Sequence, residues 1–194
     1  MKRIEICGGI ASGKTTLASI LKQLDYNVVF ERFMDNPFLN EFYTSNGSDN
    51  TFETEMVFLL LHYNLLKERK TNQITVCDYS FFQDYSYAVN NLKTTEMLYF
   101  KEIYSYLINR VDEADIIIYL KCDVNILLRR IYFRNRQMEK SITKKYLTDT
   151  IYNLEEILKG RENVIVIESD RYDFRNKDRQ YVVDIIKEGI RDLR

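Results

Sequence analysis

Five short apolar runs alternate along the chain with longer segments whose apolar residues recur at helical spacing. The runs are rich in valine and isoleucine and too short for helices; they occupy Ile4–Cys7, Val28–Phe30, Ile74–Cys77, Ile116–Leu120 and Val164–Ile167. Continuous apolar runs of this kind are typical of strands that are buried on both faces of a parallel sheet. Their alternation with helices predicts an α/β fold with helices on both faces of the sheet.

The longer segments predict the helices that would cover this sheet. They span Thr51–Lys70, Ser80–Leu92, Thr94–Val111, Asp123–Arg136, Ser141–Lys159 and Asn176–Leu193. We find no internal repeat, low-complexity tract or linker between them, so we expect a single domain over residues 1–194.

Charge and hydropathy exclude several classes of partner. The chain has 28 lysines and arginines against 29 acidic residues, a net charge of −1, which provides no basic field for a nucleic acid. The longest apolar run, Val57–Leu61, is far too short to span a membrane, and the charged first residues do not resemble a signal peptide. We therefore expect a cytoplasmic protein that binds neither nucleic acid nor membrane.

A phosphate-binding motif follows the first apolar run. Gly8, Gly13, Lys14 and Thr15 fit the pattern G-x-x-x-x-G-K-[ST], between a predicted strand and a predicted helix. In such a loop backbone N–H groups bind the phosphates, the lysine neutralises their charge, and the hydroxyl can bind Mg²⁺. A purely structural glycine turn is the weaker alternative. The motif predicts a site for ATP and Mg²⁺ made by Gly8, Gly9, Ile10, Ala11, Ser12, Gly13, Lys14, Thr15 and Thr16.

An acidic residue, Glu31, follows the second predicted strand, where neighbouring parallel strands end beside the loop. A carboxylate there can accept a proton from an attacking hydroxyl. The stretch VVFERFMDNPFLNEFY resembles the bacterial deoxyadenosine/deoxyguanosine kinase-like branch of the deoxynucleoside kinase family. The resemblance implies that Glu31 is the general base and that Tyr43 holds the 3′-hydroxyl of a deoxyribose. We therefore expect a P-loop NTPase three-layer fold with strand order 2-3-1-4-5.

The stretch CDYSFFQD is similar to the Asp/Glu-Arg-Ser motif of the same family. The resemblance implies that Asp78 lies near Mg²⁺ and that Asp84 binds the base. One position departs from the pattern, because Tyr79 stands where the family has arginine. The sequence thus lacks the cation expected beside the general base, which favours a diverged acceptor site with Tyr79 in its wall.

Two further stretches resemble parts of the family's ATP site. RRIYFRNRQME, within a lid of about residues 129–140, resembles the arginine lid, and there Arg130 and Arg134 share one helical face. This likeness implies that Arg130, Arg134 and Arg136 close over the triphosphate and that Glu139 reaches the sugar; a solvated basic helix face is the alternative. The stretch after the fifth strand resembles the adenine-binding loop, which implicates Asp170, Arg171, Tyr172, Asp173 and Phe174.

The long helix before the third strand carries the expected nucleobase contacts. The family has a glutamine and, two turns later, an arginine, which align best with Glu55 and His62, although Glu53 is a competing match. Seven positions separate Glu55 from His62, so both lie on one helical face. A locally hydrogen-bonded histidine is as good an explanation of His62 as a base contact. Two carboxylates, Glu55 and Asp84, around one base should raise the pKa of one of them.

These patterns together predict an enzyme that transfers the γ-phosphoryl group of ATP to the 5′-hydroxyl of a nucleoside. The resemblance to the bacterial branch of the family implies a purine deoxynucleoside as the favoured acceptor. The apolar content of Thr51–Lys70 and Thr94–Val111 favours a homodimer. Two alternatives stay open: a nucleoside monophosphate kinase of thymidylate kinase type, and a nucleotide-binding sensor without turnover.

Overall fold

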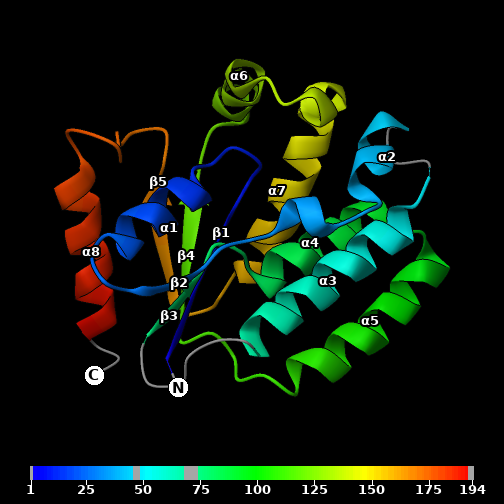
Figure 1. Cartoon of the computed structure of the whole chain (residues 1–194), viewed down its shortest axis with the longest axis horizontal. Helices are drawn as coiled ribbons and strands as arrows, with labels where there is room; N and C mark the ends of the chain where they lie inside the picture. The colour runs from blue at the N-terminus through cyan, green and yellow to red at the C-terminus, as the bar shows by residue number, and fades with distance from the viewer. Residues whose placement is uncertain (1, 46–48, 68–73, 192–194) are drawn as a thin grey trace.

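Five parallel strands form one sheet in the order β2-β3-β1-β4-β5 (Figure 1). The structure is a computed structural model that describes residues 2–45, 49–67 and 74–191. The order confirms the prediction, and so does the three-layer arrangement with helices on both faces. The strands are β1 (Arg3–Gly8), β2 (Asn27–Val29), β3 (Thr75–Cys77), β4 (Ile116–Lys121) and β5 (Val164–Glu168).

The central strand, β1, pairs with β3 on one side and β4 on the other. All six of its residues are buried, and the two charged ones, Arg3 and Glu5, pair with each other over 2.9 Å. The carboxyl ends of all the strands consequently lie at one edge of the sheet, where the segments that follow them meet.

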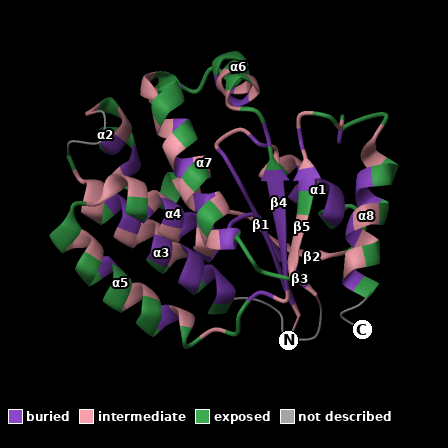
Figure 2. Cartoon of the chain, turned by 180° about the vertical axis from the view of Figure 1, so that it is seen from behind, coloured by how far each residue is buried: buried purple, intermediate pink, exposed green. Residues whose placement is uncertain are grey.

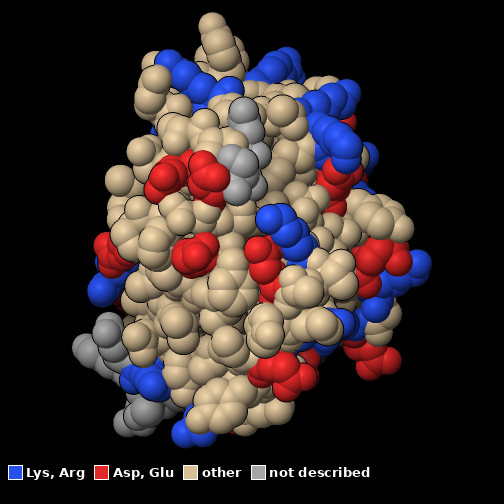
Figure 3. Space-filling view, turned by 90° about the vertical axis from the view of Figure 1, so that its right-hand side faces the viewer, with Lys and Arg blue, Asp and Glu red and all other residues tan. Residues whose placement is uncertain are grey.

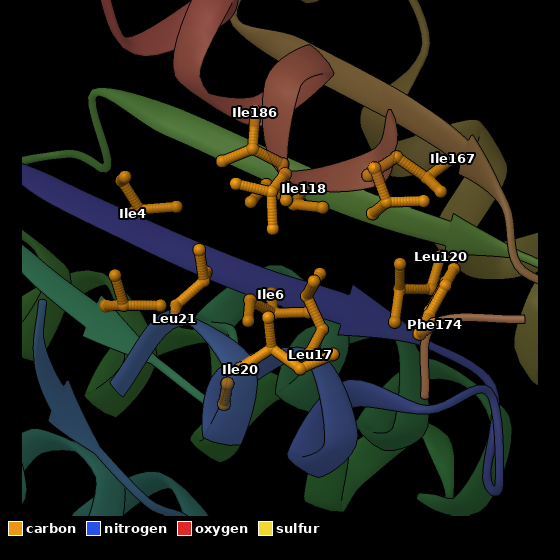
Figure 4. Close-up of a cluster of buried hydrophobic side chains, with 14 of the residues drawn as sticks. Ile4, Ile6, Leu17, Ile20, Leu21, Ile118, Leu120, Ile167, Phe174 and Ile186 are labelled. Carbon is orange, nitrogen blue, oxygen red and sulfur yellow. The ribbon is translucent and has the colours of Figure 1, made fainter. Parts of the chain in front are cut away.

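One face of the sheet is covered by α1 (Lys14–Lys22) and α8 (Arg179–Arg191). Figure 4 shows Leu17 and Leu21 of α1 and Ile186 of α8 packed against isoleucines of β1 and β4. These side chains are fully or almost fully excluded from solvent. Their burial provides much of the stabilisation that fixes the loop between β1 and α1.

On the other face, the helical layer is two helices deep. The helices α4 (Phe81–Asn91) and α7 (Lys144–Leu158) lie closer to the sheet, and α3 (Thr51–Lys67) and α5 (Thr94–Ile108) lie further out. Figure 2 shows the central strands β1 and β4 buried and the edge strands β2 and β5 mostly intermediate, whereas the outer side of α5 is exposed. Short helices α2 (Leu39–Thr44) and α6 (Val124–Arg134) flank the carboxyl edge of the sheet.

The helices differ from the predicted segments mainly at their ends. The predicted helix Asp123–Arg136 ends earlier, because Asn135 adopts a left-handed conformation with φ 49°. A short 3₁₀-helix, η2 (Gln137–Ser141), then separates α6 from α7. The short helices α2 and η1 (Phe33–Asp35) were not predicted, since neither is long enough to show a periodic pattern. The last residues of the predicted helices 51–70 and 176–193 lie outside the described residues.

The three cysteines, Cys7, Cys77 and Cys122, are buried, and none of them forms a disulfide bond. Among the described helices, none combines the length and the apolar character needed to cross a lipid bilayer.

Candidate active site

A cavity of about 1220 Å³ opens at the carboxyl edge of the sheet. Parallel α/β sheets bind ligands at this edge, because the loops that follow neighbouring strands diverge there. The segments after β1, β2 and β5 contribute to its walls, together with side chains of α2, α3, α4 and α6. Most of the residues that the sequence predicts to be functional therefore surround one space.

The loop after β1 has the backbone geometry that its glycines predict. Gly8 has φ 148° and Gly13 has φ 108°, and a Cβ atom on Gly8 would lie 2.7 Å from the carbonyl oxygen of Leu120. The ammonium group of Lys14 donates a hydrogen bond to the carbonyl oxygen of Gly8 over 3.1 Å. Residues 10–16 line the cavity, whereas Gly8 and Gly9 lie behind them. The loop and the N-terminus of α1 can therefore bind an anion.

Asp78 lies directly after β3 and is buried, with only 2% of the residue exposed. Its Oδ1 atom has no hydrogen-bond partner among the described residues. Burial raises the pKa of Asp78 to about 6, against the opposing effects of the Thr15 hydroxyl and of Lys14. An unpaired carboxylate oxygen next to a threonine hydroxyl fits the ligand preference of Mg²⁺. The described residues contain no group of three protein ligands for a metal, so phosphate oxygens and water would complete the coordination.

Glu31 follows β2 and lines the same cavity, with 23% of its side chain exposed. Burial by itself would raise the pKa of Glu31, but the neighbouring His62, Lys14 and Arg136 outweigh it and hold this pKa below its usual value. Glu31 is therefore ionised at neutral pH and able to accept a proton.

His62 lies behind the cavity wall, between two carboxylates. Its Nδ1 atom is 2.8 Å from Oδ2 of Asp84, and its Nε2 atom is 3.5 Å from Oε1 of Glu31. Its ring stacks on Tyr79 with centroids 4.1 Å apart and an interplanar angle of 9°. Burial opposes the charged form, but the two carboxylates raise the pKa of His62 to about 10.

Two expectations about this region are wrong. Tyr79 is only 1% exposed and lies under His62, so it does not form part of the cavity wall. His62 is 2% exposed and is not a wall residue either, because its ring nitrogens face Asp84 and Glu31. The arginine of the family motif is absent at position 79, and the side chain beside Glu31 is instead His62 of α3, whose Nε2 atom lies 3.5 Å from Oε1.

Glu55 of α3 faces the cavity and is 4% exposed. The side-chain amide of Asn91 donates a hydrogen bond to its Oε1 atom over 2.7 Å. Burial, with a further contribution from Asp84, raises the pKa of Glu55 to about 8, as the paired carboxylates predict. The competing match Glu53 is exposed, so Glu55 is the residue that the helix presents to the cavity.

We expect the variant Glu55→Gln to be more stable than the wild type at pH 8. The folded pKa of Glu55 lies above its ordinary value of 4.5, so the unfolded chain loses this proton first and stability falls as the pH rises from about 4.5 to about 8. Glutamine removes this cost and can still accept the Asn91 hydrogen bond. The gain should be at least about 1 kcal/mol, or roughly 2–4 °C in Tm.

Thermal unfolding followed by circular dichroism at pH 5 and pH 8 tests this expectation. The matched control is Glu53→Gln on the exposed side of the same helix, which should leave Tm unchanged. An equal gain from Glu55→Gln at both pH values would contradict the raised pKa.

The lid arginines make contacts within the protein. Arg130 donates to the carbonyl oxygens of Ser12, over 3.2 Å, and Ser169, over 2.7 Å. Arg134 donates two hydrogen bonds of 2.6 Å to the carboxylate of Glu139, and Arg136 lies 3.4 Å from it. The shared face of Arg130 and Arg134 is confirmed, since both lie on α6 and line the cavity.

The segment after β5 lines the cavity beside the loop. All five predicted residues, 170–174, contribute to the wall. Asp170 accepts a hydrogen bond of 3.0 Å from the backbone N–H of Asp123, which fixes the segment to the start of α6. The ring of Phe174 is buried, and a Cβ atom on Gly13 would lie 3.5 Å from it, so this segment packs directly on the phosphate loop.

The sequence motifs did not predict several residues in and around the cavity wall. Tyr87 and Tyr146 line the cavity, and Gln83 accepts a hydrogen bond of 3.0 Å from the Gly8 N–H. Asn91 binds both Glu55 and the Tyr146 hydroxyl. Helical spacing could have indicated two of them. Tyr87 and Asn91 lie three and seven positions after Asp84, so all three are on one face of α4.

Comparisons with known proteins agree with this site. A sequence profile described as "Deoxynucleoside kinase" matches residues 4–191. The chain is 32% identical over 183 residues to a deoxyguanosine kinase of Bacillus subtilis, covering 88% of each chain. It is 27% identical to a deoxyadenosine/deoxycytidine kinase of the same organism, covering 97% of this chain and 93% of that one.

A solved structure of the deoxyadenosine kinase from M. mycoides with bound dCTP has the same fold, with a TM-score of 0.80 at 22% identity over 98% of this chain and 99% of that chain. The family profile spans nearly the whole chain, and the first relative exceeds 30% identity over most of its length. The chain therefore belongs to the deoxynucleoside kinase family, whose members are phosphotransferases that phosphorylate nucleosides with ATP as the phosphate donor.

Proposed function

We propose that the protein transfers the γ-phosphoryl group of ATP to the 5′-hydroxyl of a purine deoxynucleoside. The observation that carries the proposal is the position of Glu31. Its carboxylate follows β2, is held ionised by its neighbours, and lines the cavity that the phosphate loop also lines. A base and a triphosphate site in one cavity are what direct transfer between two small molecules requires.

On the donor side, residues 10–16 would bind the phosphates of ATP, and residues 170–174 would bind its adenine. The N–H groups of the loop and the ammonium of Lys14 oppose the negative charge of the phosphates. Arg130, Arg134 and Arg136 add charge near the transferred group when the lid residues leave their protein partners. Thr15 and Asp78 would hold Mg²⁺, which when bound supplies charge neutralisation between the phosphates.

On the acceptor side, Glu31 accepts the proton of the 5′-hydroxyl as its oxygen attacks the γ-phosphorus. The bond between the γ-phosphorus and the β–γ bridging oxygen breaks, and ADP leaves with that oxygen. Tyr43 and Glu139 line the adjoining wall and would bind the hydroxyl groups of the sugar.

A purine acceptor is supported by the relatives and by the chemistry of Glu55. The curated relative at 32% identity is a deoxyguanosine kinase. A carboxylate can accept hydrogen bonds from both N1–H and the 2-amino group of guanine, and a protonated carboxyl group can pair with N1 and the 6-amino group of adenine. Because the pKa of Glu55 is about 8, both forms occur near neutral pH.

A panel of acceptors with Mg·ATP tests the proposal. Deoxyguanosine, deoxyadenosine, the pyrimidine deoxynucleosides and the ribonucleosides are each supplied at equal concentration, and ADP release is followed by a coupled assay. We expect the purine deoxynucleosides to have the highest kcat/KM. Higher values for pyrimidines would refute the base preference. A preference for nucleoside monophosphates would refute the acceptor class.

We further propose a homodimer formed by the outer helices. The exposed apolar side chains of α3 and α5 include Leu60, Leu98, Tyr99 and Tyr106, and Figure 3 shows much uncharged surface on this side of the molecule. Apolar surface of this kind marks an interface when it is contiguous.

Light scattering should give twice the monomer mass. Leu98→Glu should give the monomer, whereas Tyr181→Glu on the opposite face should not; a monomeric wild type across a wide concentration range contradicts the proposal.

A further inference from the structure

His62 is surrounded by carboxyl groups from three elements. Asp84 of α4 lies 2.8 Å from one ring nitrogen, and Glu31 after β2 lies 3.5 Å from the other. Asp78, after β3, is close enough for the charge of His62 to lower its pKa. The Nε2 atom has no hydrogen-bond partner among the described residues, although it is buried and directed at Glu31. A charged imidazole would donate from both nitrogens, one to each neighbour.

The remaining charged groups near this cluster are engaged elsewhere. Lys14 and Arg136 act on Glu31 from the cavity side, where the first binds the loop carbonyl of Gly8 and the second lies by Glu139. Glu5, whose pKa is raised in part by the charge of Asp84, is paired with Arg3 at 2.9 Å. His62 is therefore the cation that contacts Glu31 from behind the cavity wall.

The ring of His62 stacks on the ring of Tyr79. The two rings are parallel and 4.1 Å apart, and the Tyr79 hydroxyl donates to the backbone carbonyl of His62 over 3.2 Å. The face of an aromatic ring is negative, so this stack also favours the charged imidazole. Arginine at this position would place a second cation against His62. Tyr79, the residue that departs from the family pattern, can therefore stack on a charged His62 without adding a second cation.

We propose that His62, as an imidazolium, is a positioning residue that orients Glu31 and keeps it ionised, and that His62 with Tyr79 replaces the arginine of the family's Asp/Glu-Arg-Ser motif. This inference rests on the proposed role of Glu31 as the general base. It predicts that positions 62 and 79 are coupled: a cation is needed at one of them, and cations at both are harmful.

The charge on His62 can be measured without any turnover. The chain has one histidine, so the ring signals of tag-free protein in a ¹H–¹³C NMR spectrum belong to His62 alone. We expect chemical shifts of the charged ring, unchanged between pH 5.5 and pH 8.5. Asp84→Asn should lower the pKa into this range because it removes the closest carboxylate. Titration of the wild-type ring near pH 6.5 would overturn the proposal, whatever the catalytic activity.

The effect on Glu31 is measured by the pH dependence of kcat. In His62→Gln the Glu31 carboxylate loses its neighbouring cation, so its pKa rises and the acidic limb of the profile should move up by about one pH unit or more. On the acidic limb, at pH values below the pKa of Glu31 in both proteins, turnover should fall about tenfold, and it should recover by pH 9. The control Asn64→Gln, on the exposed side of the same helix, should leave the profile unchanged. A uniform loss at all pH values would indicate a structural role and refute the inference.

The double variant His62→Gln/Tyr79→Arg tests whether an arginine at position 79 can replace the cation at position 62. Tyr79→Arg alone should lower kcat, since it adds a cation beside His62, whereas Tyr79→Arg in the His62→Gln background should raise kcat above that of His62→Gln. Independent effects of the two changes would contradict the replacement. A charged His62 in a protein that phosphorylates no acceptor would instead refute the proposed function and leave the histidine's charge established.

Discussion

Replacing Glu31 by glutamine is expected to lower turnover by roughly 10²–10⁴-fold, the range for loss of a general base. Glutamine has nearly the same shape and can still accept a hydrogen bond from His62, but it cannot take the proton of the acceptor hydroxyl. Because the carboxylate contributes little to substrate affinity in this role, KM should change far less than kcat. Steady-state kinetics with the preferred nucleoside and saturating Mg·ATP measure both constants.

The matched control is Asp35→Asn, an exposed carboxylate in η1 four positions further along the chain. This variant makes the same chemical change outside the cavity and should retain wild-type kcat. Loss of nucleoside binding in Glu31→Gln, shown by calorimetry, would mean that Glu31 has a binding role. Unchanged kcat would eliminate it as the base.

Replacing Lys14 by alanine is expected to weaken Mg·ATP binding by about 10–100-fold, which corresponds to the roughly 1.5–3 kcal/mol of a hydrogen bond to a charged group. Its ammonium group donates a hydrogen bond to the Gly8 carbonyl oxygen, so the side chain lies against the loop that would hold the phosphates. Turnover should fall as well, because negative charge redistributes towards the leaving oxygen during transfer. Calorimetry with ATP and Mg²⁺ gives the affinity directly.

Lys22→Ala provides the comparison for this experiment. Lys22 lies in the last turn of the same helix, is exposed, and is absent from the cavity wall. Its replacement should leave the affinity for ATP unchanged. Equal affinities of Lys14→Ala and the wild type would overturn the assignment of the donor site.

The fold could be predicted from local patterns because each pattern had a single structural solution. The valine-rich and isoleucine-rich runs around Ile6 and Ile118 are too short and too apolar for anything but buried strands. The spacing of Gly8, Gly13 and Lys14 fixed the loop, since only glycine adopts the backbone conformations observed there without strain. The same reasoning located Glu31, because strand ends in a parallel sheet converge on one edge.

The parts that could not be predicted depend on contacts between distant elements. His62, Tyr79 and Asp84 come from three elements, and nothing in their local sequence shows that the histidine ring would lie on the tyrosine and between two carboxylates. The end of α6 depends on the left-handed conformation of one residue, Asn135, in a segment that otherwise continues a helical pattern. The role of each site residue, the homodimer and the single domain over residues 1–194 stay predictions.

The most direct test of the proposed reaction is the identity of its product. Wild-type protein is incubated with Mg·ATP and deoxyguanosine or deoxyadenosine, and the mixture is examined by ³¹P NMR and mass spectrometry. We expect a deoxynucleoside 5′-monophosphate to form in a one-to-one ratio with ADP. ATP binding without transfer to any nucleoside would contradict the proposal and favour a nucleotide sensor. Transfer to a nucleoside monophosphate alone would contradict it in favour of a thymidylate kinase-type enzyme.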